Sequence, residues 1–160
     1  MLSVAFKEWA VVCRALAEGR QRVILRKGGI AEEGGRFRPE FDRFWLYPTH
    51  FHEQQQAGIR DEFLPLLAEA EAGRPPAGVV RLSHVAEVTA VAFAESLDAV
   101  LALADQHIWS EATVRQRFAY RTPGLYVLAV NVTRAEAPLE ILESPEYAGC
   151  KTWVHLRCGN

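Results

Sequence analysis

Cysteine and long apolar runs are both scarce in this sequence, and each scarcity argues against a class of protein. The cysteines are Cys13, Cys150 and Cys158. They form no C-x-x-C pair, which argues against a disulfide framework and favours Cys13 as a small packed side chain. No stretch approaches the roughly 20 uninterrupted apolar residues of a membrane span. The first residues place no basic segment before an apolar one, so we expect no signal peptide, no membrane partner and a cytoplasmic location.

Motifs for nucleophilic catalysis and metal binding are also missing. No G-x-S-x-G or H-E-x-x-H motif occurs, and no cysteine adjoins a histidine. His50 and His52 would point to the same side of a strand and share a metal there, with Glu53 nearby. Their spacing supplies only two histidine ligands, and a site needs a third. We therefore expect no metal and no cofactor, with the two histidines closing a strand and donating hydrogen bonds.

Length and composition indicate one folded domain over residues 1–160. Hydrophobic residues make up 49% and charged residues 24% of the chain, which are ordinary values for a globular protein. A chain of this length buries roughly 70% of its unfolded surface in a single core.

Hydrophobic periodicity predicts helices and strands that do not alternate as β-α-β units would. A helix capped by Ser3 runs to Gly19, because apolar residues recur there every three or four positions. Pro65 kinks or breaks a second helix over 54–71. The other predicted elements are strands at 22–26, 44–48, 79–93 (bent or bulged), 125–133 (covered on both faces) and 152–156, a helix at 97–104, a helix capped by Ser110, and a glycine-bracketed loop at 28–35. Their order favours a mixed or antiparallel barrel with helices outside it.

The strand at 22–26 carries the most basic part of the chain. Residues 20–43 contain seven basic and four acidic side chains, in a protein whose formal net charge is −2. Strand alternation turns Val23 and Leu25 toward a core and Arg22, Ile24 and Arg26 the other way. A local positive excess on a mildly acidic protein indicates a specific anionic partner.

Cations beside aromatic rings are typical of nucleic-acid sites, where they hold phosphates and stack bases. The turn that begins at Arg26 and Lys27 continues into two glycines, whose exposed backbone amides favour binding of an oxyanion or a phosphate. Core packing is the alternative for each aromatic ring, and a solvated surface is the alternative for the arginines at 115–121. The residues we expect to bind nucleic acid are Arg22, Arg26, Lys27, Trp45, Tyr47, His52, Trp109, Arg117 and Lys151.

Two other classes of function stay open. One is a small hydrolase or nuclease that acts on nucleosides or RNA and uses Lys27, Glu8 and His52 for acid and base chemistry. Without such a role, Lys7 and Glu8 would lie on the surface of the first helix as solvated charges or a salt bridge. The other class is a protein-interaction module. The oligomeric state and the identity of the nucleic acid are open as well.

Two resemblances to known families follow from these motifs. A helix that leads into a glycine, a basic residue and a strand ending in arginine occurs at Gly19, Arg20 and Arg26, and residues 126–138 form a late strand that leads to a proline. This arrangement resembles the ASCH branch of the PUA-like superfamily, small β-barrels linked with RNA. For the enzyme alternative, that resemblance implies lysine-dependent amidohydrolase or nuclease chemistry.

Four short segments, KEW at 7–9, LRKGGI at 25–30, LYPT at 46–49 and GCKTW at 149–153, are similar to a bacterial family known as domain-of-unknown-function family 1802. This second resemblance spans nearly the whole chain and implies no activity.

Together these features predict a single α+β domain, a PUA-like mixed β-barrel with helices packed outside. We expect it to bind RNA or a modified nucleotide in a cleft between the basic strand and the late helix. Arg26 and Lys27 would hold phosphate, while Trp45, Tyr47 or Trp109 would stack a base.

Overall fold

The computed structural model describes residues 1–28, 30–34, 36–149 and 151–157. The strands are β1 (Val4–Trp9), β2 (Val23–Arg26), β3 (Ile30–Glu33), β4 (Arg36–Pro39), β5 (Arg43–Thr49), β6 (Val79–Ala94), β7 (Leu125–Leu142) and β8 (Trp153–His155). The helices are α1 (Ala10–Ala17), α2 (His52–Gly58), α3 (Leu64–Ala72), α4 (Leu97–Leu101) and α5 (Glu111–Ala119), with 3-10 turns at Asp61–Phe63, Ala104–Gln106 and Pro145–Tyr147. No helix in the described ranges is long and apolar enough to cross a membrane.

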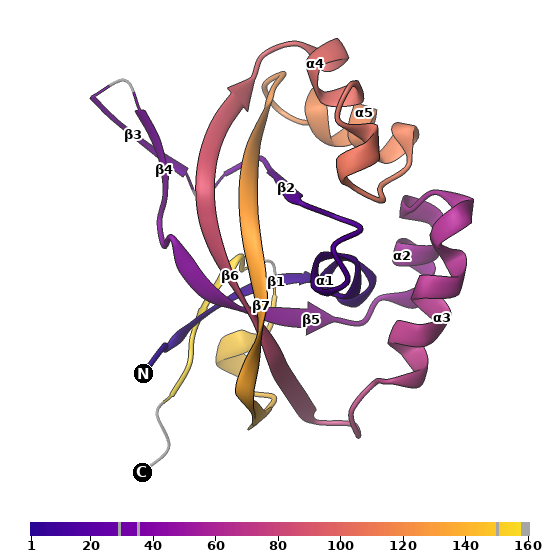
Figure 1. Ribbon diagram of the computed structural model, residues 1–160, viewed down its shortest axis with the longest axis vertical. Helices are drawn as coiled ribbons and strands as arrows, with labels where there is room; N and C mark the ends of the chain where they lie inside the picture. The colour runs from indigo at the N-terminus through magenta and orange to yellow at the C-terminus, as the bar shows by residue number, and fades with distance from the viewer. Residues whose placement is uncertain (29, 35, 150, 158–160) are drawn as a thin grey trace.

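Six strands form one curled sheet in the order β2-β7-β6-β5-β1-β8, and β3 and β4 form a separate hairpin. Only β1 and β5 pair in parallel; the other pairs in the described ranges are antiparallel. β6 and β7 are the long curved strands in Figure 1, and register shifts at Leu82/His84 and Val88/Ala90 interrupt their pairing. These bulges explain the bend predicted for residues 79–93. The predicted α+β class is confirmed, as a barrel-like sheet that is curled and not closed.

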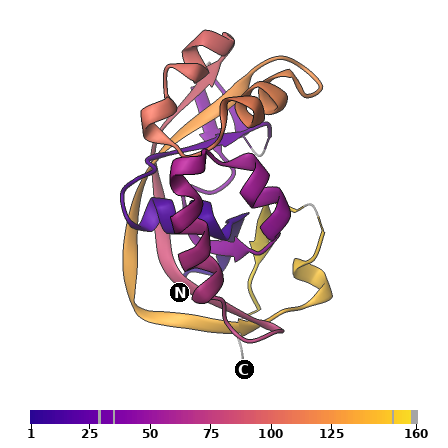
Figure 2. The same cartoon turned by 90° about the vertical axis from the view of Figure 1, so that its right-hand side faces the viewer.

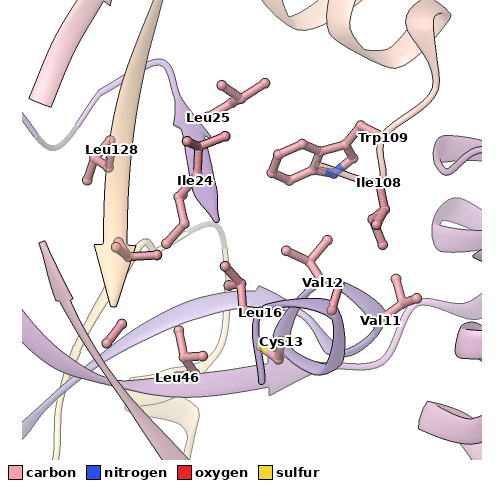
Figure 3. Packing of buried hydrophobic residues seen from close by; sticks show 14 of the residues in the cluster. Val11, Val12, Cys13, Leu16, Ile24, Leu25, Leu46, Ile108, Trp109 and Leu128 are labelled. Atoms are coloured by element: carbon pink, nitrogen blue, oxygen red, sulfur yellow. The ribbon is translucent and has the colours of Figure 1, made fainter. Parts of the chain in front are cut away.

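All five helices lie on one side of the curled sheet, and the β3–β4 hairpin projects from the opposite side (Figures 1 and 2). The main core fills the space between this sheet face and the helices. Figure 3 shows buried side chains from α1, β2, β7 and the segment before α5 converging there, among them Val12, Ile24 and Trp109. A smaller buried cluster on the other sheet face includes Trp45 and Tyr47. The helix-covered face therefore carries the main core, and the opposite face carries the smaller cluster.

Strand alternation decides which side chains of β1 reach the helices. Val4 and Phe6 belong to the main core, whereas Ala5 belongs to the smaller cluster on the other face. Because successive side chains on a strand point to opposite faces, Glu8 follows Phe6 to the helix-covered side. Lys7 is registered with Tyr47 of β5 and shares the other side.

The N-terminal helix predicted from Ser3 is wrong in its first half. Residues from Val4 to Trp9 form a central strand that pairs with both β5 and β8, and the helix begins only at Ala10. The apolar residues of this segment are buried by two neighbouring strands, and this tertiary pairing overrides the local helical spacing. The prediction that Lys7 and Glu8 lie on a helix surface is therefore also wrong.

The basic strand and the loop after it differ from their predicted forms. Both faces of β2 are covered, because Val23, Ile24 and Leu25 are all buried. Residues of the predicted loop at 28–35 belong instead to the β3–β4 hairpin, whose turn includes Gly34 at a φ of 58°. Positive φ favours glycine because it has no Cβ. Gly29, Gly35, Cys150 and Cys158 lie outside the described residues.

Two other boundaries differ from the prediction. The helix predicted over 54–71 is broken as expected, but the break lies at 59–63, and Pro65 sits in the first turn of α3, where a missing N–H costs nothing. β7 continues nine residues beyond the predicted end at Thr133, and its second half is mostly exposed. The strands predicted at 22–26, 44–48, 79–93 and 152–156 and the helix at 97–104 are confirmed within a few residues. Ser110 caps α5 as predicted, by accepting a hydrogen bond from the Thr113 amide.

Candidate functional site

A cleft of about 1490 Å³ runs between β1, β5, α1, the far part of the β6–β7 ribbon and the segment before β8. This volume exceeds the roughly 300–1,000 Å³ of ordinary small-molecule pockets. Its charged lining residues are Lys7, Glu8, Arg14, Glu18, Arg26, Arg74, Arg81, Arg117, Arg134, Glu143 and Lys151. Eight of these are basic and three are acidic, although the whole chain carries a net charge of −2. The cleft therefore concentrates positive charge.

Glu8 is the buried carboxylate of this cleft, with only 5% of its surface exposed. Its Oε1 accepts a hydrogen bond from the Trp9 amide at 2.8 Å. Its Oε2 is inaccessible to solvent and has no hydrogen-bond partner within the described residues. Burial raises the pKa of Glu8, and the positive charges of Arg117 and Arg26 oppose that rise. A buried carboxyl with a free oxygen and a raised pKa, lining a cleft, is typical of a functional position.

Arg117 projects from α5 into the same cleft. Its guanidinium carbon lies 5.1 Å from the ring centre of Trp9 and 5.0 Å from that of Trp109. These aromatic contacts fix the group without using its hydrogen-bond donors. Burial lowers the pKa of Arg117, and Glu8 opposes this effect, but a guanidinium keeps its charge in proteins. In the described parts of the chain, Arg117 has no hydrogen bond and no ion pair. Its N–H donors are thus available to a ligand.

Arg26 is the last residue of β2 and also lines the cleft. Its guanidinium lies 5.0 Å from the Phe6 ring and donates a hydrogen bond to Thr152 Oγ1. Its Nε is buried without a partner among the described residues. Burial lowers the pKa of Arg26, Glu8 raises it, and Arg117 lowers it again. Arg26 and Arg117 are therefore close enough to repel one another, and both are attracted to Glu8.

The rim of the cleft adds further cations and one exposed ring. Lys7 donates to the carbonyls of Tyr147 and Gly149, and Lys151 donates to the carbonyl of Glu146 at 3.0 Å. Phe51 also lines the cleft, and 56% of its surface is exposed. An exposed ring in a cleft that is also lined by cations provides a surface on which a base can stack.

The cleft brings together five of the ten residues predicted from the sequence to bind or catalyse. The five that line it are Glu8, Arg26, Tyr47, Arg117 and Lys151. Arg22, Lys27, Trp45, His52 and Trp109 are not among its lining residues. Of the three residues named for hydrolysis, only Glu8 lines the cleft.

Lys27 has a well-defined environment outside the cleft. Its ammonium group donates to the carbonyls of Phe118, Thr122 and Gly124, at 2.8 Å for Phe118 and 2.7 Å for Gly124. An ammonium group has three N–H donors. Lys27 therefore ties the end of α5 and the start of β7 to the end of β2.

The two tryptophans predicted as stacking surfaces are buried. Trp45 donates its indole N–H to the Leu2 carbonyl at 3.1 Å and packs in the smaller cluster. Trp109 is 1% exposed and belongs to the main core. Its ring contacts Arg117 instead of solvent. Neither ring is therefore open to a base, and Trp109 contributes to the cleft only by holding Arg117.

The strand geometry predicted for the two histidines is wrong. His50 follows β5, but His52 is the first residue of α2, so the two do not share one side of a strand. His52 is exposed, and its Nδ1 lies 3.6 Å from Glu71 Oε1. Within the described ranges, no group of three histidine, cysteine or acidic side chains is arranged to hold a metal ion.

Sequence reasoning missed Arg134 and Phe51 and gave Glu8 only a secondary role. The available signal for Glu8 was its position between the apolar residues Phe6 and Trp9. A charge at an inward position of an otherwise buried strand is unusual and typical of a functional site. No local signal indicated Arg134, because only the β6–β7 pairing brings it to the cleft.

Solved structures show which fold this is. The structure of ASCH from Zymomonas mobilis matches with a TM-score of 0.57 and 15% identity, covering 96% of this chain and 87% of that one. Structures of a serine-to-alanine and a tyrosine-to-phenylalanine variant of that protein match with TM-scores of 0.54 and 13% identity, covering 96% of this chain and 87% and 89% of theirs. Identities this low show a shared fold alone, and they confirm the predicted PUA-like ASCH architecture.

No curated protein matches the sequence. The family resemblance found in the short segments is confirmed, because residues 5–158 match the family's sequence pattern. The chain belongs to the family described as Domain of unknown function (DUF1802).

Proposed function

We propose that the cleft binds single-stranded RNA, or a nucleotide derived from it, through its phosphates. The observation that carries the proposal is Arg117, a guanidinium held between two tryptophan rings with its donors unpaired among the described residues. Orienting it in advance lowers the entropy cost of binding. Planar guanidinium groups suit phosphate oxygens, with which they form paired hydrogen bonds.

Size and charge of the cleft support a polymer over a small metabolite. Its volume of about 1490 Å³ leaves room for more than one nucleotide unit. The cations along it, among them Arg117, Arg134 and Lys151, suit a backbone that carries one negative charge per nucleotide. Phe51 supplies an exposed ring at the rim for base stacking.

Binding, not hydrolysis, is the function that the position of the side chains favours. Hydrolysis by Lys27, Glu8 and His52 requires the three groups to act on one ligand. Lys27 instead donates to three carbonyls, and His52 lies at the start of α2 beside Glu71. Glu8 is the remaining acid or base of that set in the cleft.

Fluorescence anisotropy with a labelled single-stranded RNA at low salt tests this proposal. Arg117→Met keeps an apolar stem between the tryptophans but removes the charge, and Arg115→Met is its matched control. Arg115 lies on the same helix but pairs with Glu111 outside the cleft. We expect Arg117→Met to weaken binding at least tenfold, which is about 1.4 kcal/mol. Phe51→Ala should weaken it by a smaller factor.

The salt dependence provides a second readout. Removing one cation that binds a phosphate of a single strand lowers the slope of log affinity against log salt by about 0.7. Arg117→Met should show this change, and Arg115→Met should retain the wild-type slope. Absence of RNA binding by the wild-type protein at low salt, or equal reductions in affinity in the two variants, would contradict the proposal.

A further inference from the structure

Glu8 occupies the position that an anionic ligand would also prefer. Its carboxylate is attracted to both Arg26 and Arg117, yet it forms no ion pair with either within the described residues. One oxygen is held by the Trp9 amide, and the other is buried and has no partner in the same ranges. The carboxylate thus acts as an internal counter-ion that partly neutralises two guanidinium groups without consuming their donors.

We infer that a phosphate entering this site replaces the negative charge of Glu8, so that the cleft binds the phosphate together with one proton taken up by Glu8. This inference rests on the proposed function and concerns the same site. The ligand group is a phosphodiester anion. It competes with the Glu8 carboxylate for the positive charges of Arg26 and Arg117.

The physical reason is the electrostatic free energy of three charged groups close together, the negative Glu8 and the positive Arg26 and Arg117. Before binding, the two guanidinium groups favour the charged form of Glu8, whereas burial opposes it. A phosphate beside them compensates their charge and adds a like charge near Glu8, so the neutral carboxylic acid becomes favoured. When protonated, the Glu8 carboxyl group also no longer repels the phosphate.

Charged and titratable side chains from the neighbouring elements influence the protonation of Glu8. Arg26 faces Glu8 from β2 and Arg117 faces it from α5. From α1, the Cys13 thiol donates to the Glu8 carbonyl at 3.7 Å, and burial together with Glu8 raises the pKa of this thiol well above its usual value, so it stays neutral. His50 and His84 also line the cleft, and burial lowers the pKa of both.

Proton uptake is measured directly on the wild-type protein. RNA with hydroxyl groups at both ends is titrated calorimetrically in two buffers of different ionisation enthalpy at one pH. Its phosphodiesters do not titrate in this range, unlike a terminal phosphate with a second pKa near 6. We expect uptake of up to one proton per site and an affinity that rises by up to about tenfold per unit of pH decrease while Glu8 titrates.

Glu8→Gln identifies the group that takes the proton, with Glu95→Gln as a control for the change in net charge. Glu95 is exposed and lies outside the cleft lining. A neutral amide does not compete for the arginines. We therefore expect Glu8→Gln to bind RNA more tightly than wild type at pH 8 and to show no proton uptake, while Glu95→Gln keeps it.

The outcomes separate the two proposals. If the wild-type protein binds no RNA, the proposed function itself fails. If RNA binds and Arg117→Met weakens this binding, the proposed function stands. Absence of proton uptake by the wild type then overturns only this inference. Proton uptake that Glu8→Gln retains overturns it too, and a histidine is then the proton acceptor. Weaker binding by Glu8→Gln at every pH also overturns it, because Glu8 would then contact the ligand as an acceptor. If Glu8→Gln fails to fold, His50→Gln and His84→Gln decide, because both histidines line the cleft. Loss of the proton uptake in either variant overturns the inference, and uptake retained in both supports Glu8 as the acceptor.

Discussion

Arg26 and Lys27 are adjacent in the sequence and lie at the end of the same strand, yet their side chains serve different regions of the molecule. Arg26 turns into the cleft, where it lies over Phe6 and is attracted to Glu8. Lys27 turns the other way and donates to three backbone carbonyls between α5 and β7. One cation is positioned to meet a ligand, and the other joins elements of the fold.

The difference shows that basic character alone does not identify an anion site. A basic side chain can bind an anion only if its hydrogen-bond donors are not already bonded to other groups of the protein. All three N–H donors of an ammonium group can be satisfied by three carbonyls, as at Lys27. At Arg26, Nε is buried without a partner within the described residues. A cation whose donors are all satisfied, as at Lys27, is therefore not assigned to the anion site, whatever the local charge.

Replacing Lys27 should produce the largest effect. Lys27→Met removes three charge-assisted hydrogen bonds and leaves the carbonyls of Phe118 and Gly124 with one partner fewer. Each such bond contributes about 1.5–3 kcal/mol, and water replaces part of it here. We expect the free energy of unfolding to fall by about 3–4 kcal/mol, as measured by urea denaturation, with little change in RNA affinity.

Arg20→Met is the control for Lys27→Met, because Arg20 is an exposed cation close to the same strand that pairs with Glu18 across the surface. Its removal should leave stability nearly unchanged, as surface pairs contribute little. If Lys27→Met were as stable as wild type but bound RNA at least tenfold more weakly, the division between the two residues would be wrong.

Acid stability of the whole fold must be separated from titration in the cleft, and His107 is a buried group outside the cleft lining that bears on the former. It is buried, and neither ring nitrogen has a partner in the described ranges. Burial, with Arg60 adding to it, lowers the pKa of His107 from 6.5 to about 4. The unfolded chain therefore binds a proton more readily, and we expect this histidine to lower stability by about 3 kcal/mol in total as the pH drops from about 6.5 toward 4.

His107→Phe should remove most of this acid-induced destabilisation, because phenylalanine keeps a ring beside Trp109 and cannot be protonated. His52→Gln is the control, since His52 is exposed at the start of α2. Chemical denaturation at several pH values provides the measurement. If His107→Phe loses as much stability in acid as the wild-type protein, groups other than His107 cause that loss.

The fold could be predicted from the sequence where local signals decided it. The cap at Ser110, the long valine-rich strand and the strand closed near Pro48 are local features, and all three appear. The first strand failed because its neighbours are residues 43–49 and 153–155, which supply the burial that a helix at this position would lack. Such pairing partners leave no trace in the segment itself.

The site was predicted in part for the same reason. Arg26 and Arg117 stood out as cations near glycine or aromatic residues, and the structure brings both to the cleft. Lys27 could not be distinguished from Arg26, because the carbonyls that it contacts lie more than ninety residues later in the chain. Glu8 needed the correct strand before its inward direction could be inferred.

Arg26→Gln tests whether Arg26, unlike Lys27, serves the cleft. We expect it to reduce stability less than Lys27→Met does and to reduce RNA binding more. The glutamine keeps polar contact with Thr152 within reach but removes the charge that faces the ligand. We expect RNA affinity to fall about five- to tenfold, which is about 1 kcal/mol, and the salt slope to fall by about 0.7. Anisotropy titrations at several salt concentrations measure both. Unchanged affinity in this variant, with normal binding by wild type, would remove Arg26 from the site.

The smallest expected effect is a pH-dependent gain in stability from Glu8→Gln without ligand. Burial raises the pKa of Glu8 above that of the unfolded chain, so the folded state holds a proton more tightly. The stability that this provides is present in full below the unfolded pKa and is lost as the pH rises through the folded pKa. Glu8→Gln has no group that titrates here, so its melting temperature should exceed that of wild type at pH 8, and the difference should shrink as the pH falls toward 4.5, the ordinary pKa of a free glutamate. His107 titrates equally in both proteins and cancels from this difference, whereas Lys27→Met should be less stable than wild type at every pH. A Glu8→Gln protein that melts below wild type at pH 8 would mean that the attraction of Arg26 and Arg117 outweighs burial, and that Glu8 is a stabilising counter-ion in the empty cleft.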